Sequence, residues 1–134
     1  MGSILIIDDE EDIRDALQMV LESAGYDVKV ASNGNEAVAL QRAEPADLII
    51  TDIIMPEKDG VSTIKEIRQD FPGTRIIAIS GGGGVQPVEY VPEAITTTAY
   101  LAAAKEAGAD MAFTKPFERE DLIQAVNDLF AKVH

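Results

Sequence analysis

ILIIDD, residues 4–9, joins a short apolar run to two consecutive aspartates, Asp8 and Asp9. The run has the length and flanks of a buried strand, so the aspartates fall where that strand would end. The same arrangement returns at residues 48–52, where LIIT precedes Asp52. Neither run alternates with polar residues, which is typical of strands covered on both faces and therefore of a parallel sheet. The two stretches predict an α/β fold.

A lysine follows a third run of this kind. MAFT, residues 111–114, leads into Lys115 and Pro116. In an open parallel sheet the carboxyl ends of the strands share one edge, and ligands bind in the crevice there. We therefore expect the three aspartates and the lysine to meet at one edge. That arrangement suits a hard cation and a phosphoryl group.

Strands and helices are predicted to alternate along the chain. Apolar residues recur at helical spacing between the strand-like runs, and Gly25, Pro45 and either Asn33 or Asn35 stand where helices would begin or end. We expect strands at residues 4–8, 26–31, 48–52, 75–80 and 111–114, and helices at residues 13–24, 33–43, 60–70 and 122–133. These elements predict a doubly wound five-stranded parallel sheet with helices on both faces. The length of the chain predicts a single domain spanning residues 1–134.

The segment between Ser80 and Met111 is less regular. It contains four consecutive glycines, Gly81–Gly84, followed by a stretch rich in threonine and alanine. The glycines are consistent with a flexible loop or with a hinge beside the site, since glycine gives the backbone freedom at low steric cost. A helix with a weak apolar stripe is expected at about residues 94–107.

Composition argues against several classes of function. Acidic residues outnumber basic ones by 24 to 11, giving a formal net charge of −13, so direct nucleic-acid binding through a basic face is not expected. The absence of cysteine excludes disulfides, thiolate zinc sites and redox pairs. The N-terminus has neither a basic region nor a long apolar stretch, so we expect no signal peptide and no membrane anchor. An acidic surface is consistent with a cytoplasmic protein.

Asp8, Asp9 and Asp52 are candidate ligands for Mg²⁺. Adjacent carboxylates repel each other unless a positive charge lies between them, and Mg²⁺ prefers oxygen ligands. One residue of the Asp8-Asp9 pair would alternatively cap the following helix, and Asp52 alone would be an ordinary turn residue. A carboxylate becomes a nucleophile toward phosphorus when a metal neutralises the phosphoryl oxygens.

Lys115 and Ser80 are candidates for contact with a phosphoryl group. Lys115 carries a point charge with three donors at a strand end, and Ser80 offers a hydroxyl at the end of the fourth expected strand. Each also has a plainer interpretation, as a solvated lysine and as a turn residue.

The chain lacks residues that three classes of enzyme require. A serine hydrolase needs a G-x-S-x-G elbow and a histidine, but residue 78 is Ala78 and the only histidine is His134. A P-loop needs a lysine directly after its glycines, and none follows Gly84. A phosphatase of the haloacid dehalogenase type shares the aspartate nucleophile, but Ile54 occupies the place of its acid/base aspartate.

With these residues in this order, the chain resembles a receiver domain of two-component response regulators, of the chemotaxis-regulator type. The resemblance covers essentially the whole chain. The residues that carry it are Asp8-Asp9, Asp52 with Met55-Pro56 and Gly60, Ser80, Gly108-Ala109-Asp110 and Lys115-Pro116-Phe117. It implies a flavodoxin-like fold with the strand order 2-1-3-4-5.

The resemblance also implies roles for the acidic residues. Asp52 would accept a phosphoryl group from a sensor histidine kinase or a phosphotransfer protein and hold it as an acyl phosphate. Mg²⁺ would be bound by the side chains of Asp9 and Asp52 and by the backbone carbonyl of Ile54. Asp8 would hold the metal through water.

Further implications concern the switch. Lys115 would pair with Asp52 and then with the phosphoryl group, through a turn in which the Lys115–Pro116 bond is cis. Ser80 would move to bond a phosphoryl oxygen. The family usually has an aromatic residue three positions before the lysine, where this chain has Ala112 followed by Phe113, so we expect a segment change rather than an aromatic flip.

We therefore expect a signalling switch that catalyses only its own phosphorylation and dephosphorylation. Its conformation would change around residues 80–115 for an output partner, and the phosphoryl group would be lost slowly because Ile54 and Gly82 cannot orient water. The alternatives are a degenerate receiver that only binds a partner and a haloacid-dehalogenase-type phosphatase. No membrane contact is expected. Output by docking, onward relay of the phosphoryl group, and output through a longer chain all stay open.

Overall fold

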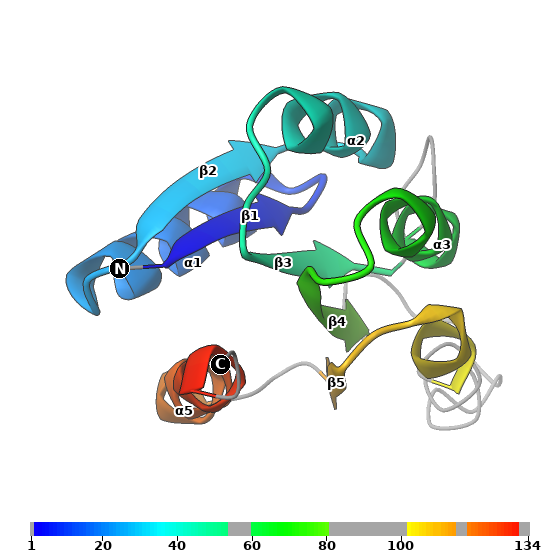
Figure 1. The fold of residues 1–134 in the computed structure, drawn as a ribbon. Helices are drawn as coiled ribbons and strands as arrows, with labels where there is room; N and C mark the ends of the chain where they lie inside the picture. Colours follow the sequence, from blue (N-terminus) through cyan, green and yellow to red (C-terminus); the bar gives the residue numbers. More distant parts are fainter. Residues whose placement is uncertain (1, 54–59, 81–101, 115–117, 132–134) are drawn as a thin grey trace, which may run out of the picture.

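The computed structural model describes residues 2–53, 60–80, 102–114 and 118–131. Within them, five parallel strands form one sheet in the order β2-β1-β3-β4-β5 (Figure 1). The strands are β1 (Ser3–Ile7), β2 (Asp27–Ala31), β3 (Leu48–Asp52), β4 (Arg75–Ser80) and β5 (Met111–Thr114). The helices are α1 (Glu11–Ser23), α2 (Gly34–Ala43), α3 (Gly60–Asp70) and α5 (Arg119–Ala131), and residues 102–107 are also helical. The predicted doubly wound fold and its strand order are confirmed.

Helices cover both faces of the sheet (Figure 1). Helices α1 and α5 lie on one face, and α2, α3 and residues 102–107 lie on the other. Successive side chains of β1 alternate between the two cores: Ile4 and Ile6 pack toward α1 and α5, and Leu5 and Ile7 pack toward α2 and α3. Every residue of the central strand β3 is buried. Burial on both faces is the reason that this strand reads as an uninterrupted apolar run.

The start of α2 is capped as its sequence predicts. Asn33 is the N-cap, and its side-chain oxygen accepts a hydrogen bond of 2.8 Å from the amide of Glu36. The Glu36 carboxylate in turn accepts bonds of 2.8 Å from both the amide and the hydroxyl of Ser32. The first of these bonds satisfies an amide that the first turn of a helix leaves free, and the other two hold the residue before the cap. Of the two candidate caps, the structure selects Asn33.

Two helices begin earlier than their apolar stripes predict. Helix α1 starts at Glu11 and α5 at Arg119, because acidic and other polar residues fill their first turns, where a negative charge favours the helix dipole. Gly25 follows α1 with a φ of 102°, as expected of a glycine that ends a helix. Of the helix predicted at residues 94–107, residues 102–107 are helical, and the rest lies outside the described residues.

Arg68 and Asp110 form an ion pair at the amino-terminal edge of the sheet, beside β4 and β5. Arg68, near the end of α3, donates to the carbonyl oxygens of Thr74 at 2.7 Å and Gly108 at 2.8 Å and pairs with Asp110 at 3.3 Å. Asp110 also accepts a bond of 2.8 Å from the amide of Ile76. Gly108 has a φ of +131°, and the Arg68 side chain occupies the space that its Cβ would need.

Among the described helices, none is both long and apolar enough to cross a membrane.

Candidate functional site

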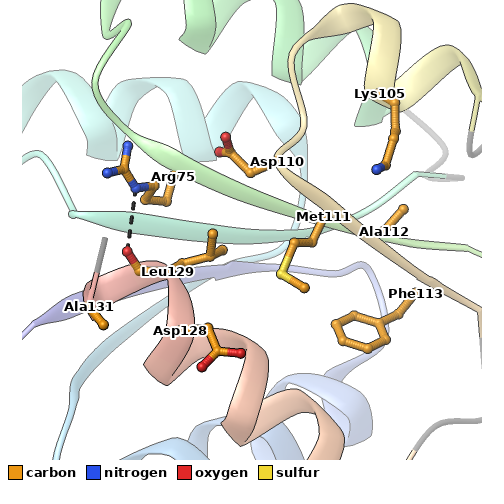
Figure 2. Close-up of a pocket in the computed structure, with 9 residues that line it drawn as sticks. All are labelled: Arg75, Lys105, Asp110, Met111, Ala112, Phe113, Asp128, Leu129 and Ala131. Carbon is orange, nitrogen blue, oxygen red and sulfur yellow. Dashed lines mark hydrogen bonds between the residues drawn. The ribbon is translucent and has the colours of Figure 1, made fainter. Parts of the chain in front are cut away.

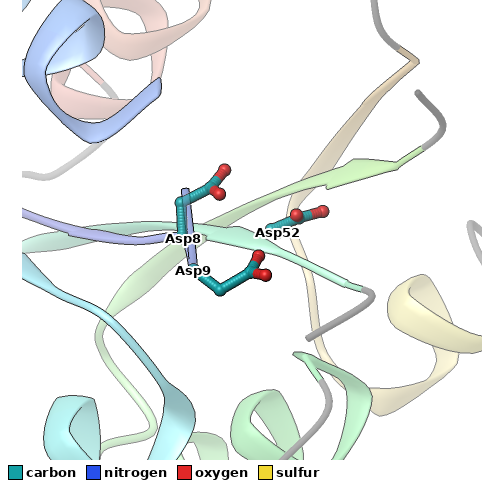
Figure 3. A group of neighbouring side chains, drawn as sticks. All are labelled: Asp8, Asp9 and Asp52. Carbon is teal, nitrogen blue, oxygen red and sulfur yellow. The ribbon is translucent and has the colours of Figure 1, made fainter. Parts of the chain in front are cut away.

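Three carboxylates meet at the carboxyl edge of the sheet. Asp8 follows β1 directly and Asp52 ends β3, and these two strands are paired so that Ile7 lies opposite Thr51. One carboxylate oxygen from each of Asp8, Asp9 and Asp52 lies within 4.8 Å of the other two (Figure 3). The structure thus brings together all three aspartates that the sequence singles out.

The three residues differ in their exposure. Asp8 is 2% exposed and Asp52 is 9% exposed, whereas Asp9 is exposed to solvent. Repulsion between carboxylates grows as they are withdrawn from water, because the effective dielectric constant falls. A cation reaching this group from the solvent side, where Asp9 lies, would relieve that repulsion.

Asp8 is held by its backbone as well as by its side chain. Its amide donates to the carbonyl of Ala31 at 3.2 Å, its carbonyl accepts a bond of 2.8 Å from Nη1 of Arg14, and its Oδ1 accepts a bond of 2.9 Å from the amide of Glu10. The N-cap of α1 is Glu10, and within the described residues its side chain makes no capping bond. Asp8 therefore orders the turn before α1 and does not cap the first turn of that helix.

The end of β3 is fixed on two sides. The amide of Ile53, directly after Asp52, donates to the carbonyl of Ile79 in β4 at 3.0 Å. The carbonyl of Ile53 accepts a bond of 2.7 Å from the amide of Gly60, the first residue of α3. Thr51 donates its hydroxyl to the carbonyl of Asp52 at 2.9 Å. The backbone that carries the Asp52 carboxylate is thus tied both to the neighbouring strand and to α3.

The ends of β4 and β5 reach the same edge. Ser80 is the last residue of β4 and pairs with Thr114, the last residue of β5, while Asp52 pairs with Ile79. Three other parts of the predicted site lie outside the described residues: Ile54 with Met55-Pro56, Gly81–Gly84 with most of the following segment, and Lys115-Pro116-Phe117. The predicted cis bond and the predicted switch segment therefore stay predictions.

The aromatic residue of β5 lies on the face opposite to Ala112. Ala112 packs against the core beneath α2 and α3, whereas Phe113 packs against the core beneath α1 and α5. Both side chains line a groove of about 860 Å³ along β5, between residues 102–107 and α5 (Figure 2). Because successive strand residues point to opposite faces, Phe113 cannot replace an aromatic side chain at position 112.

The donor set fits a hard divalent cation. Carboxylate oxygens are the ligands that Mg²⁺ takes in proteins, and the ion keeps several of its waters, so a few carboxylates at one edge suffice. Asp8, Asp9 and Asp52 offer three such oxygens within mutual reach. Sequence reasoning missed Arg14, since a single arginine in the first turn of a helix carries no local sign of the backbone that it binds.

Comparisons with known proteins agree on one family. A family model described as the response regulator receiver domain matches residues 4–127. Chemotaxis protein CheY of Halobacterium salinarum is 31% identical over 126 residues, which cover 94% of each chain. Transcriptional regulatory protein CpxR of Klebsiella pneumoniae is 29% identical over all 134 residues, and the chain spans 51% of that relative's length. A response regulator receiver domain protein from Clostridium thermocellum superposes with a TM-score of 0.83 at 27% identity, covering 98% of this chain and 96% of the other.

Proposed function

This chain belongs to the response regulator receiver domain family, and we propose that Asp52 is its phosphoacceptor. Receiver domains are signalling modules without a classical enzymatic activity, and the CheY and CpxR relatives support a phosphorylation-dependent role in two-component signalling. The observation that carries the assignment is the position of the Asp52 carboxylate. It ends the central strand, 9% exposed, with oxygens of Asp8 and Asp9 within 4.8 Å.

The proposed donor is a phosphohistidine of a sensor kinase or of a phosphotransfer protein. A carboxylate oxygen of Asp52 attacks phosphorus, a P–O bond forms, and the P–N bond breaks so that the imidazole nitrogen leaves with its electron pair. The product is an acyl phosphate on Asp52. The bonds that fix both sides of Ile53 keep the nucleophile in place during this exchange.

The proposed cofactor is Mg²⁺, held by the side chains of Asp9 and Asp52 and by the backbone carbonyl of Ile54, with Asp8 acting through water. When bound, the ion neutralises the phosphoryl oxygens that would otherwise be repelled by three carboxylates. Asp8 and Asp9 supply the negative charge that attracts it. Asp8 is buried and its backbone is held by hydrogen bonds. Its carboxylate is therefore better suited to orienting a water on the metal than to exchanging freely with solvent.

The proposed response to phosphorylation involves residues 80–115. Lys115 pairs with the phosphoryl group, Ser80 bonds one of its oxygens, and the segment between them adopts a second arrangement that an output partner recognises. The pairing of Ser80 with Thr114 supports this, since it brings the chain to the edge that carries Asp52. We propose that residues 1–134 act as one receiver domain.

Two alternatives make different predictions. A degenerate receiver would bind a partner without accepting a phosphoryl group, but the cluster of Asp8, Asp9 and Asp52 keeps the acids that transfer requires. A phosphatase of the haloacid dehalogenase type would turn over phosphomonoesters steadily. Ile54 denies that mechanism its proton donor.

Acetyl phosphate distinguishes these functions. We expect intact-mass analysis to show the gain of one phosphoryl group when acetyl phosphate and Mg²⁺ are both present, and none when EDTA removes the cation. Asp52→Asn should abolish the gain. Asp47→Asn, a matched change at the opposite edge of the sheet, should leave it unchanged. A wild-type level of labelling in the Asp52→Asn protein would refute the assignment.

A further inference from the structure

Arg14 contacts the backbone of the acidic pair. It lies in the first turn of α1, half-buried, and its Nη1 donates to the carbonyl oxygen of Asp8 at 2.8 Å. That carbonyl belongs to the peptide unit that joins Asp8 to Asp9. Rotation of this unit would turn the backbone of Asp9 relative to Asp8, and the carboxylates of the two residues would separate. The bond from Arg14 opposes that rotation.

The charge of Arg14 also acts on Glu36, in the first turn of α2. Arg14 contributes to lowering the pKa of Glu36, after the two hydrogen bonds from Ser32, so its charge lies close enough to act on that carboxylate. Glu36 is itself held by two bonds from Ser32. Ser32 follows Ala31, and the carbonyl of Ala31 accepts a bond from the Asp8 amide. The contact that fixes the guanidinium is its bond to the carbonyl of Asp8. A planar guanidinium, which holds its donors in fixed directions, suits a directed bond to a backbone carbonyl.

We propose that Arg14 is a positioning residue for the metal site, and that it holds the Asp8–Asp9 peptide so that both carboxylates stay directed toward Asp52. The inference rests on the proposed function, since it presumes that these aspartates bind a divalent cation. Arg14 touches neither the cation nor the phosphoryl group in this account. It acts on the backbone of the residues that do.

The sign of the effect separates positioning from simple electrostatics. A guanidinium near three carboxylates repels an incoming cation, so its removal would tighten Mg²⁺ binding if charge were its only contribution. A positioning residue has the opposite effect, because its loss frees the ligands to move apart. Partners that orient metal ligands typically contribute about tenfold or more to metal affinity.

The test is a titration of the 134-residue protein with MgCl₂, followed by the backbone amide signals of Asp9 and Glu10 in NMR spectra. We expect the Kd for Mg²⁺ to rise about tenfold in Arg14→Met, in spite of the lost positive charge. Arg14→Lys keeps the charge but lacks the planar fork, so its Kd should rise as well. Should Arg14→Met fail to fold, Arg14→Lys still separates the two effects, because charge alone would leave its Kd unchanged.

Two control variants separate a local effect from loss of charge and loss of stability. Arg42→Met removes a positive charge that pairs with Glu66 and Asp70 on the surface, and the Kd should stay unchanged. Arg68→Met removes guanidinium–carbonyl bonds at the opposite edge of the sheet. It should lower the unfolding midpoint and leave the Kd unchanged.

The outcomes distinguish the inference from the function on which it rests. A wild-type protein that binds Mg²⁺ and an Arg14→Met protein that binds it equally or more tightly would overturn the positioning role alone. A Kd for Mg²⁺ that rises in Arg68→Met in proportion to its lost stability would also overturn the positioning role, since affinity would then follow global stability. A wild-type protein whose signals do not respond to Mg²⁺ would overturn the metal site and the inference together.

Discussion

The carbonyl oxygen of Asp52 lies 2.3 Å from the position that a Cβ atom on Gly60 would occupy, and the Cα of Ile53 lies 2.6 Å from it. Both neighbours are backbone atoms at the end of β3, so they cannot move aside as the tip of a flexible side chain would. The missing side chain at Gly60 lets α3 begin directly against the proposed phosphoacceptor strand. The bond of 2.7 Å from the Gly60 amide to Ile53 depends on this close approach.

Gly60→Ala should destabilise the protein and impair phosphorylation. The added methyl group must push α3 away from β3, and overpacking of this kind costs about 1–3 kcal/mol. Urea unfolding measures the stability, and intact mass after acetyl phosphate treatment measures the labelling. Gly73→Ala is the matched control, because no described atom lies within 4 Å of its Cβ position. Equal effects of the two substitutions would show that the contact at Gly60 is unimportant.

Asp9→Asn should stabilise the metal-free protein and remove its response to Mg²⁺. The substitution removes one of three like charges within 4.8 Å, an effect on the order of 1 kcal/mol at an exposed position. Mg²⁺ that binds only the folded wild type would raise its stability by about 2.7 kcal/mol at one hundred times the Kd. Thermal unfolding in EDTA and in MgCl₂ measures both. Asp47→Asn should behave as wild type, and a full response to Mg²⁺ in Asp9→Asn would argue against Asp9 as a ligand.

Asp110→Ala should destabilise the protein more than Asp110→Asn. Alanine leaves the Ile76 amide without its side-chain acceptor and removes the partner of Arg68, whereas asparagine keeps an oxygen for the amide and loses the charge. We expect a loss of about 1–2 kcal/mol for alanine in urea unfolding. The Kd for Mg²⁺ should not change, because this network lies at the opposite edge of the sheet. Equal losses in the two variants would show that the ion pair, which both of them remove, dominates over the amide bond.

Glu36 should titrate below its ordinary pKa of 4.5. The amide of Ser32 and then its hydroxyl favour the ionised carboxylate, burial opposes them, and the charge of Arg14 makes a smaller favourable contribution. Because the folded pKa is lowered, the stabilisation from this carboxylate is present above the unfolded pKa and is lost as pH falls through the folded value. NMR titration of the Glu36 carboxyl carbon measures the pKa. Ser32→Ala should raise it without restoring 4.5, since the backbone bond remains, and an unchanged pKa would show that the hydroxyl bond is not formed in solution.

Much of the secondary structure follows from the sequence. The predicted bounds of β3, β4, β5 and α3 are the observed ones, because each buried run ends at a charged or polar residue or at a glycine. The strand order came from the family resemblance rather than from any local pattern, and pairing confirms it. The acids at the strand ends could be selected because parallel strands place their carboxyl ends at one edge.

The tertiary structure alone decided how individual side chains use that edge. Asp8 and Asp9 are adjacent in the sequence, yet one is 2% exposed and the other is open to solvent, because the chain leaves the sheet between them. Arg14 reaches the Asp8 carbonyl only once α1 has packed back against β1. Arg68 and Asp110 meet across 42 positions of sequence. Periodicity and propensity describe neighbours along the chain, whereas these contacts depend on how helices settle onto the sheet, and that packing leaves no local mark in the sequence.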